Sequence, residues 1–106
     1  SGKANFCYST SDNYDDVFHI GLGETLCKTD PKLVYCGLFE QGEKVRVIVY
    51  AGEDISKEKS AGEIVKSISQ ILGGAGGGSP KFAQGGGTDK SKKEDAIKNA
   101  KSMIIQ

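Results

Sequence analysis

The chain has 106 residues, which is enough for one compact domain. Fourteen Lys and Arg residues balance fourteen Asp and Glu residues, and this zero net charge excludes the long-range field of a histone-like or polybasic membrane-binding protein. The hydrophobic share of 37% is typical of a globular domain, whereas 15 glycines are about twice the usual number. We therefore expect any nucleic-acid contact to come from a local patch.

The three cysteines contain no C-x-x-C pair, so the sequence indicates neither a disulfide framework nor a zinc knuckle. A reducing cytosol is the expected compartment. No apolar run approaches the ~20 residues needed to cross a bilayer, so no membrane contact is predicted. The chain ends shortly after a helical pattern, and we interpret it as a piece of a larger protein.

The first part of the chain divides at about residue 15. Residues 1–14 are polar and aperiodic, and we expect an N-terminal arm or a short strand. From Asp15 to about Thr29, Phe18, Leu22 and Leu26 recur at intervals of four, which predicts a helix. Residues 15–106 are therefore expected to form the domain proper.

A β-hairpin is predicted next. Leu33–Phe39 and Lys44–Tyr50 are β-branched and aromatic, and Gly42 lies in the turn between them. In the second run, strand alternation places the apolar residues Val45, Val47 and Val49 on one face. It places Arg46, Ile48 and Tyr50 on the other face. We expect a central strand that helices cover on at least one side.

Two further helices are predicted. Ser56 to Leu72 has an apolar helical face, a capping box at Ser60–Glu63 and a stop at Gly73. Ser91 to Ile105 has a similar face and a second capping box that starts at Ser91.

Eight of the glycines lie within residues 73–87, between these two helices. A flexible linker would not place Phe82, Ala83 and Gln84 between two glycine blocks. We predict a structured loop that leads into a short strand at about Phe82 to Gly85.

The glycine segment matches no mononucleotide motif. G-x-G-x-x-G counted from Gly74 meets Ser79 at its last glycine, and G-x-x-x-x-G-K-[ST] fails because Ser79-Pro80 follows the first block. Two interpretations remain open. The glycines allow backbone to pack tightly against a helix or a partner chain, or they form a surface for a larger anionic backbone such as RNA.

Positive charge gathers next to these glycines. Residues 79–106 carry six lysines against three acidic residues, a net charge of +3. The lysines are either a solvated helix face or phosphate contacts, in which case Lys81, Lys90, Lys98 and Lys101 act together with Arg46. The two-aromatic pattern of an RRM is absent, so no base readout is predicted.

No catalytic or metal site is predicted. His19 is the only histidine and lacks convergent partners, and Cys36 in a strand is expected to be a small buried hydrophobe. The pairs Asp15-Asp16 and Glu53-Asp54 stand at expected helix starts, where the helix dipole favours negative charge.

The sequence resembles a known family at the glycines. Gly73-Gly74-Ala75-Gly76-Gly77-Gly78, four further residues and Ala83-Gln84-Gly85-Gly86 are similar to the signature near the C-terminus of alanyl-tRNA synthetases. The similarity covers roughly residues 15–105. The resemblance implies a small α/β (α+β) domain with a mixed β-sheet covered by about three helices, a domain also found in DHH phosphoesterases.

The resemblance also implies a function. The chain is expected to be a non-catalytic, tRNA-elbow-contacting and oligomerisation domain of a cytoplasmic alanine-tRNA ligase that links aminoacylation and editing. The implied partners are tRNA(Ala), the other synthetase domains and a possible second copy. No cofactor is expected here, whereas ATP, Mg and zinc are implied for the parent enzyme. The expected RNA-binding residues are Gly74, Gly76, Gly77, Gly78, Lys81, Gln84, Lys90, Lys98 and Lys101.

Two departures from the family pattern leave alternatives open. Ala75 and Ser79 stand where the family often has basic residues, so Lys81 replaces them in phosphate contact or the glycines serve packing or a dimer interface. The rival functions are a pure dimerisation module and an accessory domain of a DHH phosphoesterase or of a stand-alone alanyl-tRNA editing protein.

Overall fold

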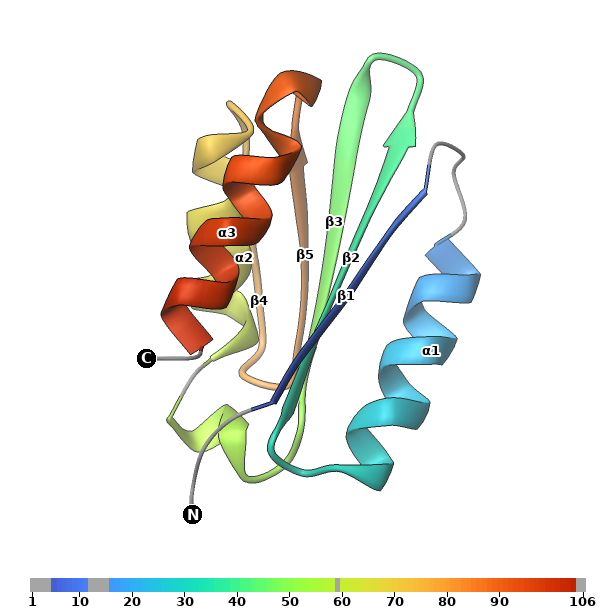
Figure 1. Ribbon diagram of the computed structural model, residues 1–106, viewed down its shortest axis with the longest axis vertical. Helices are drawn as coiled ribbons and strands as arrows, with labels where there is room; N and C mark the ends of the chain where they lie inside the picture. Colours follow the sequence, from blue (N-terminus) through green and yellow to red (C-terminus); the bar gives the residue numbers. More distant parts are fainter. Residues whose placement is uncertain (1–4, 12–15, 59, 105–106) are drawn as a thin grey trace.

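A five-stranded mixed sheet lies between one helix on one side and two on the other (Figure 1). The computed structural model describes residues 5–11, 16–58 and 60–104. The strands are β1 (Asn5–Ser11), β2 (Leu33–Gln41), β3 (Lys44–Ala51), β4 (Ala75–Gly78) and β5 (Phe82–Gly87), and the helices are α1 (Asp16–Thr29), α2 (Ala61–Ile71) and α3 (Lys93–Ile104). The predicted α/β class, mixed sheet and helical cover are confirmed.

The strand order is β1-β2-β3-β5-β4. β1 runs parallel to β2, and the other neighbouring pairs are antiparallel. β3 is therefore the central strand, as its apolar pattern predicts. For residues 1–14 the sequence predicted either an arm or a short strand. Residues 5–11 form β1, which lies at one edge of this sheet.

The two sides of the sheet are covered unequally. Val45, Val47 and Val49 of β3 are fully buried in one core with α2 and α3. α2 packs on β3, β4 and β5 from this side of the sheet. On the opposite side, α1 packs on β2 and β3. The part of the sheet formed by β5 and β4 therefore has its helical cover on the α2 side (Figure 1).

The first glycine block forms a strand, where the sequence predicted a loop. Ser79 closes a reverse turn between β4 and β5: its N–H donates to the Phe82 carbonyl (2.9 Å), and its Oγ accepts from the Phe82 N–H (3.1 Å). This turn aligns Ala75–Gly78 with Phe82–Gly87, so the glycine backbone finds its hydrogen-bond partners in an antiparallel ladder. The predicted strand at Phe82 is confirmed and extends to Gly87.

The two predicted capping boxes are not formed. α2 begins at Ala61, and the Ala61 N–H donates to the Pro80 carbonyl (2.8 Å) because the β4–β5 turn packs there; the Ser60 side chain makes no capping bond. Before α3, the Asp89 carboxylate accepts from the Ser91 N–H (3.2 Å), and Lys90–Lys92 form a short 3₁₀ turn. A second 3₁₀ turn, Ile55–Lys57, occupies the early part of the predicted α2.

Candidate nucleic-acid interface

β4, its turn and β5 form a glycine hairpin (residues 75–87), and one side of it is packed against α2. A Cβ added to Gly76 would lie 2.6 Å from Val65 Cγ1, and one added to Gly85 would lie 2.7 Å from the same atom. At the start of α2, a Cβ on Gly62 would lie 2.8 Å from the Gly78 carbonyl oxygen. These contacts leave no room for side chains, so the glycines of this closed side serve close helix–strand packing.

The other side of the glycine hairpin is open. Gly77 pairs with Gln84, which in turn pairs with Ile48, so strand alternation places these positions on the side opposite α2. Gln84 is exposed, and a Cβ added to Gly77 would meet nothing within 4 Å. We call this side, with Ala75, Gly77, Gln84 and the neighbouring Arg46, the open face.

A groove of about 400 Å³ crosses one end of the open face. Its lining includes Lys44 and Arg46 of β3, Gln84 of β5 and the glycine backbone around Gly74 and Gly86. We call it the glycine groove. In the described part of the chain, Arg46 has no ion-pair partner, and it is only partly buried. Two cationic side chains beside bare backbone form a surface suited to a phosphate backbone.

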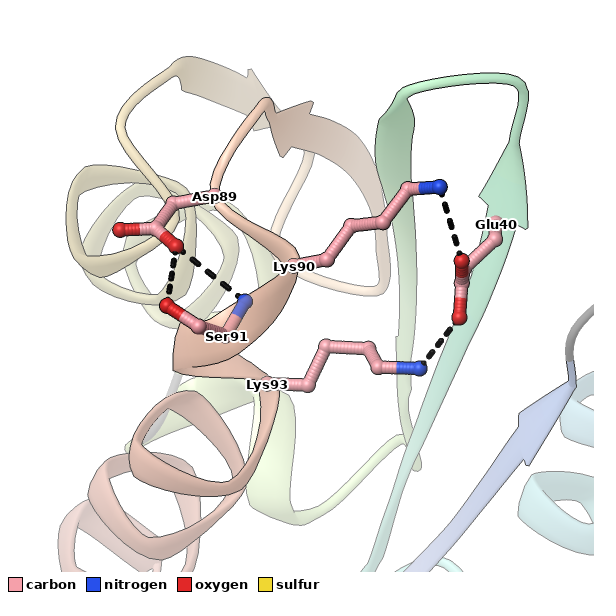
Figure 2. Close-up of polar contacts among 5 residues, drawn as sticks. All are labelled: Glu40, Asp89, Lys90, Ser91 and Lys93. Carbon is pink, nitrogen blue, oxygen red and sulfur yellow. Dashed lines mark hydrogen bonds and ion pairs between the residues drawn. The ribbon is translucent and has the colours of Figure 1, made fainter.

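A cluster of ion pairs lies at the start of α3, beside the hairpin tip of β2 and β3 (Figure 2). Lys90 Nζ lies 3.0 Å from Glu40 Oε1, and Lys93 Nζ lies 2.7 Å from Glu40 Oε2. The Glu40 side chain is 21% exposed, and hydrogen bonds from Lys93 and Lys90 lower its pKa from the ordinary value of 4.5. In this Glu40 cluster, one carboxylate engages the charges of both lysines.

The end of β5 is fixed on two sides. The N–H groups of Thr88 and Asp89 donate to the Leu72 carbonyl at the end of α2, at 3.0 and 2.9 Å. The Asp89 carboxylate also accepts from the Ser91 hydroxyl at 2.5 Å (Figure 2). Because Thr88 lines the glycine groove, its bond to Leu72 holds this part of the rim in place.

The structure brings only some of the sequence-predicted residues together. The glycine hairpin and the residue before it hold Gly74, Gly76, Gly77, Gly78, Lys81 and Gln84, with Gly76 and Gly78 facing the closed side. Lys90 belongs to the Glu40 cluster. Lys98 and Lys101 are exposed on α3, which lies beside α2 (Figure 1) and therefore on the side of the sheet opposite the open face.

Lys44 and Thr88 also line the glycine groove, and neither was among the predicted site residues. They meet because β3 pairs with β5 in a register that joins Val45 to Gly87. Strand alternation had already placed Arg46 and Tyr50 on one face. The missing signal is the pairing of β3 with a strand that follows it by more than 30 residues.

The described residues hold no group of three or more His, Cys, Asp or Glu side chains that could bind a metal ion. None of their helices is both long and apolar enough to span a membrane.

Cys36 is fully buried, as predicted, and burial raises its pKa to about 12. Burial also raises the pKa of Cys27 to about 11, so both thiols stay protonated near neutral pH. The side chain of His19 lies outside the described residues.

Comparison with known proteins identifies the family. The family model described as the DHHA1 domain matches residues 4–106. The chain belongs to the DHHA1 domain family. An alanine-tRNA ligase of Nitrosopumilus maritimus (strain SCM1) is 50% identical over 103 residues, which are 97% of this chain and 11% of that protein. An alanine-tRNA ligase of Cenarchaeum symbiosum (strain A) is 44% identical over 92 residues, 87% of this chain and 10% of that protein.

A solved structure has the same fold. The C-Ala domain of the Aquifex aeolicus alanyl-tRNA synthetase matches with a TM-score of 0.86 and 25% identity, over 93% of this chain and 89% of that one. The chain spans about a tenth of the length of the curated relatives it matches. The predicted resemblance to this synthetase domain is confirmed.

Proposed function

We propose that the chain is the C-terminal, C-Ala-type domain of a cytoplasmic alanine-tRNA ligase and that it binds tRNA(Ala) at the tRNA elbow through its open face. The similarity to two archaeal alanine-tRNA ligases and to a C-Ala domain supports the choice of parent enzyme. In this role the domain holds tRNA while other domains aminoacylate and edit it. ATP, Mg and zinc belong to those other domains.

The glycine groove is the observation that carries the RNA-binding proposal. Arg46 is free of protein ion pairs within the described residues, and Lys44 stands beside it. Gly74 and Gly86 let the two strand ends come close, since a Cβ on Gly74 would lie 2.6 Å from the Gly87 Cα. A phosphate backbone could therefore approach both the main-chain N–H groups and the two cations.

A titration of this chain with intact tRNA and with an acceptor-stem minihelix, each at two salt concentrations, tests the proposal. We expect tighter binding to intact tRNA and a clear loss of affinity with salt, because each neutralised phosphate releases counterions. Arg46→Gln should weaken binding. It should also reduce the slope of log affinity against log salt concentration by about 1, which corresponds to the loss of one phosphate contact. Equal binding to both RNAs, or an unchanged Arg46→Gln slope, contradicts the proposal.

Dimerisation is the second candidate, and the position of β4 favours it. β4 is a sheet-edge strand made of Ala75 and three glycines, and an edge strand presents backbone groups that a second copy can pair with. Sedimentation of this chain without RNA distinguishes the two roles. A dimer that Gly77→Glu dissociates supports assembly through this edge, whereas a monomer at high concentration rules it out.

A further inference from the structure

A second hollow, of about 380 Å³, lies at the opposite end of β3 from the glycine groove. Its wall is formed by Glu24 and Lys28 of α1, Tyr50 at the end of β3, Glu53 just after it and Lys81 in the β4–β5 turn. Because Tyr50 and α1 lie on the same side of the sheet as Arg46, this Tyr50 hollow opens beside the open face. Its volume lies within the range of small-molecule sites.

The ring of Tyr50 is held in position before any ligand binds. The ring centroids of Tyr50 and Phe82 lie 4.6 Å apart, with the planes tilted by 42°. On α1, Gly23 lets the helix sit against the ring, since an added Cβ would lie 2.7 Å from Tyr50 Cδ2. Burial, with a smaller contribution from Glu24, raises the pKa of Tyr50, so the phenol stays neutral. A fixed, neutral ring is a stacking surface that loses little entropy on binding.

The rim of the Tyr50 hollow carries both hydrogen-bond acceptors and donors. Lys28 Nζ lies 3.2 Å from Glu24 Oε1, and Glu53 and Lys81 are exposed on the rim. A nucleotide matches this site. Its flat base can stack on the aromatic wall, the polar atoms along the base edge can form hydrogen bonds with the carboxylates and ammonium groups, and its phosphate can pair with an ammonium group. An aliphatic side chain of a partner protein would form no hydrogen bond with Glu53 or Lys81.

We infer that the Tyr50 hollow takes one unpaired nucleobase, stacked on Tyr50, from the RNA whose backbone lies in the glycine groove. The inference rests on the proposed function. Tyr50 and Arg46 lie on one face of the same strand, four residues apart, which is ~13 Å at ~3.3 Å per residue. The exposed Gln84 lies on the neighbouring strand between them, so one RNA segment can reach both positions.

Two substitutions at Tyr50 test the stacking contact. Tyr50→Leu removes the ring, and Tyr50→Phe keeps it as the matched control. In a titration with intact tRNA, Tyr50→Leu should weaken binding about tenfold with an unchanged salt slope, because stacking is not a phosphate contact. Tyr50→Phe should bind within about twofold of the unsubstituted chain. Urea unfolding of each variant shows whether the fold is intact.

A crosslinking experiment on the unsubstituted chain removes the dependence on folding. Intact tRNA transcribed with 4-thiouridine is irradiated in complex with the chain, and mass spectrometry locates the crosslinked peptides. Crosslinks to the peptide that contains Tyr50 support the inference. Crosslinks confined to the glycine groove, or full affinity in a folded Tyr50→Leu variant, overturn it while leaving the proposed function standing. Failure of the unsubstituted chain to bind tRNA at any salt concentration removes both.

Discussion

Both sides of the glycine hairpin carry glycines, but these glycines have different surroundings. On the closed side, Gly76 and Gly85 lie against Val65 of α2 with no space for a methyl group. On the open side, Gly77 has free space, Gln84 is exposed and Arg46 is only partly buried. One glycine-rich segment therefore meets two requirements, close packing on one side and an accessible backbone on the other.

The largest expected effect is on the closed side. Gly85→Ala would place its Cβ 2.7 Å from Val65 Cγ1 and 2.8 Å from the Gly76 Cα, so α2 must shift. We expect the free energy of unfolding to fall by about 1 to 3 kcal/mol. Gly77→Ala is the matched control on the open side and should stay within about 0.5 kcal/mol of the unsubstituted chain. Urea unfolding measures both free energies. An equal decrease for Gly85→Ala and Gly77→Ala would show that the two sides do not differ in packing.

The Glu40 cluster predicts a pH dependence of stability. Its hydrogen bonds lower the pKa of Glu40, so the unfolded chain binds this proton more readily than the folded chain does. The cluster therefore stabilises the fold above the usual glutamate range, and this contribution disappears as the pH falls through the lowered pKa. Unfolding curves of Glu40→Gln and of the unsubstituted chain should converge on acidification. A constant difference from pH 7 to pH 3 would contradict this assignment.

The smallest expected effect concerns Ser69, a residue of α2 whose side chain faces Gly85 of β5. Its side-chain oxygen is fully buried and has no hydrogen-bond partner among the described residues. Ser69→Ala should raise the free energy of unfolding by about 1 kcal/mol, because an unsatisfied buried hydroxyl is costly. The same oxygen is the nearest atom to a Cβ on Gly85, so Gly85→Ala should cost less in the Ser69→Ala background. Strictly additive effects would argue against this contact.

Local patterns in the sequence predicted most of the elements. The alternation in Lys44–Tyr50 predicted a central strand with Arg46 and Tyr50 on one face, and Gly73, at φ 80°, ends α2 as expected. The strand formed by Ala75–Gly78 was missed, because glycine has low strand propensity and its pairing with β5 depends on the turn closed by Ser79.

The candidate site was predicted less completely than the fold. The glycine motif located the segment that forms the hairpin, but sequence spacing alone does not show which glycines face α2. The engagement of Lys90 by Glu40 joins residues 50 positions apart, and the placement of Lys98 and Lys101 behind the sheet depends on how α3 packs. Each of these features arises from long-range packing, which local periodicity does not encode.

We propose that tRNA binds the open face and not the helical side. The most direct test compares the tRNA affinities of Gly77→Glu and Lys101→Glu at one low salt concentration. Gly77→Glu places a single negative charge on the open face, whereas Lys101→Glu changes the charge on α3 by two units. We predict that Gly77→Glu weakens binding about tenfold or more and that Lys101→Glu weakens it less. A larger loss for Lys101→Glu would show instead that tRNA binds the side of the sheet that carries α3.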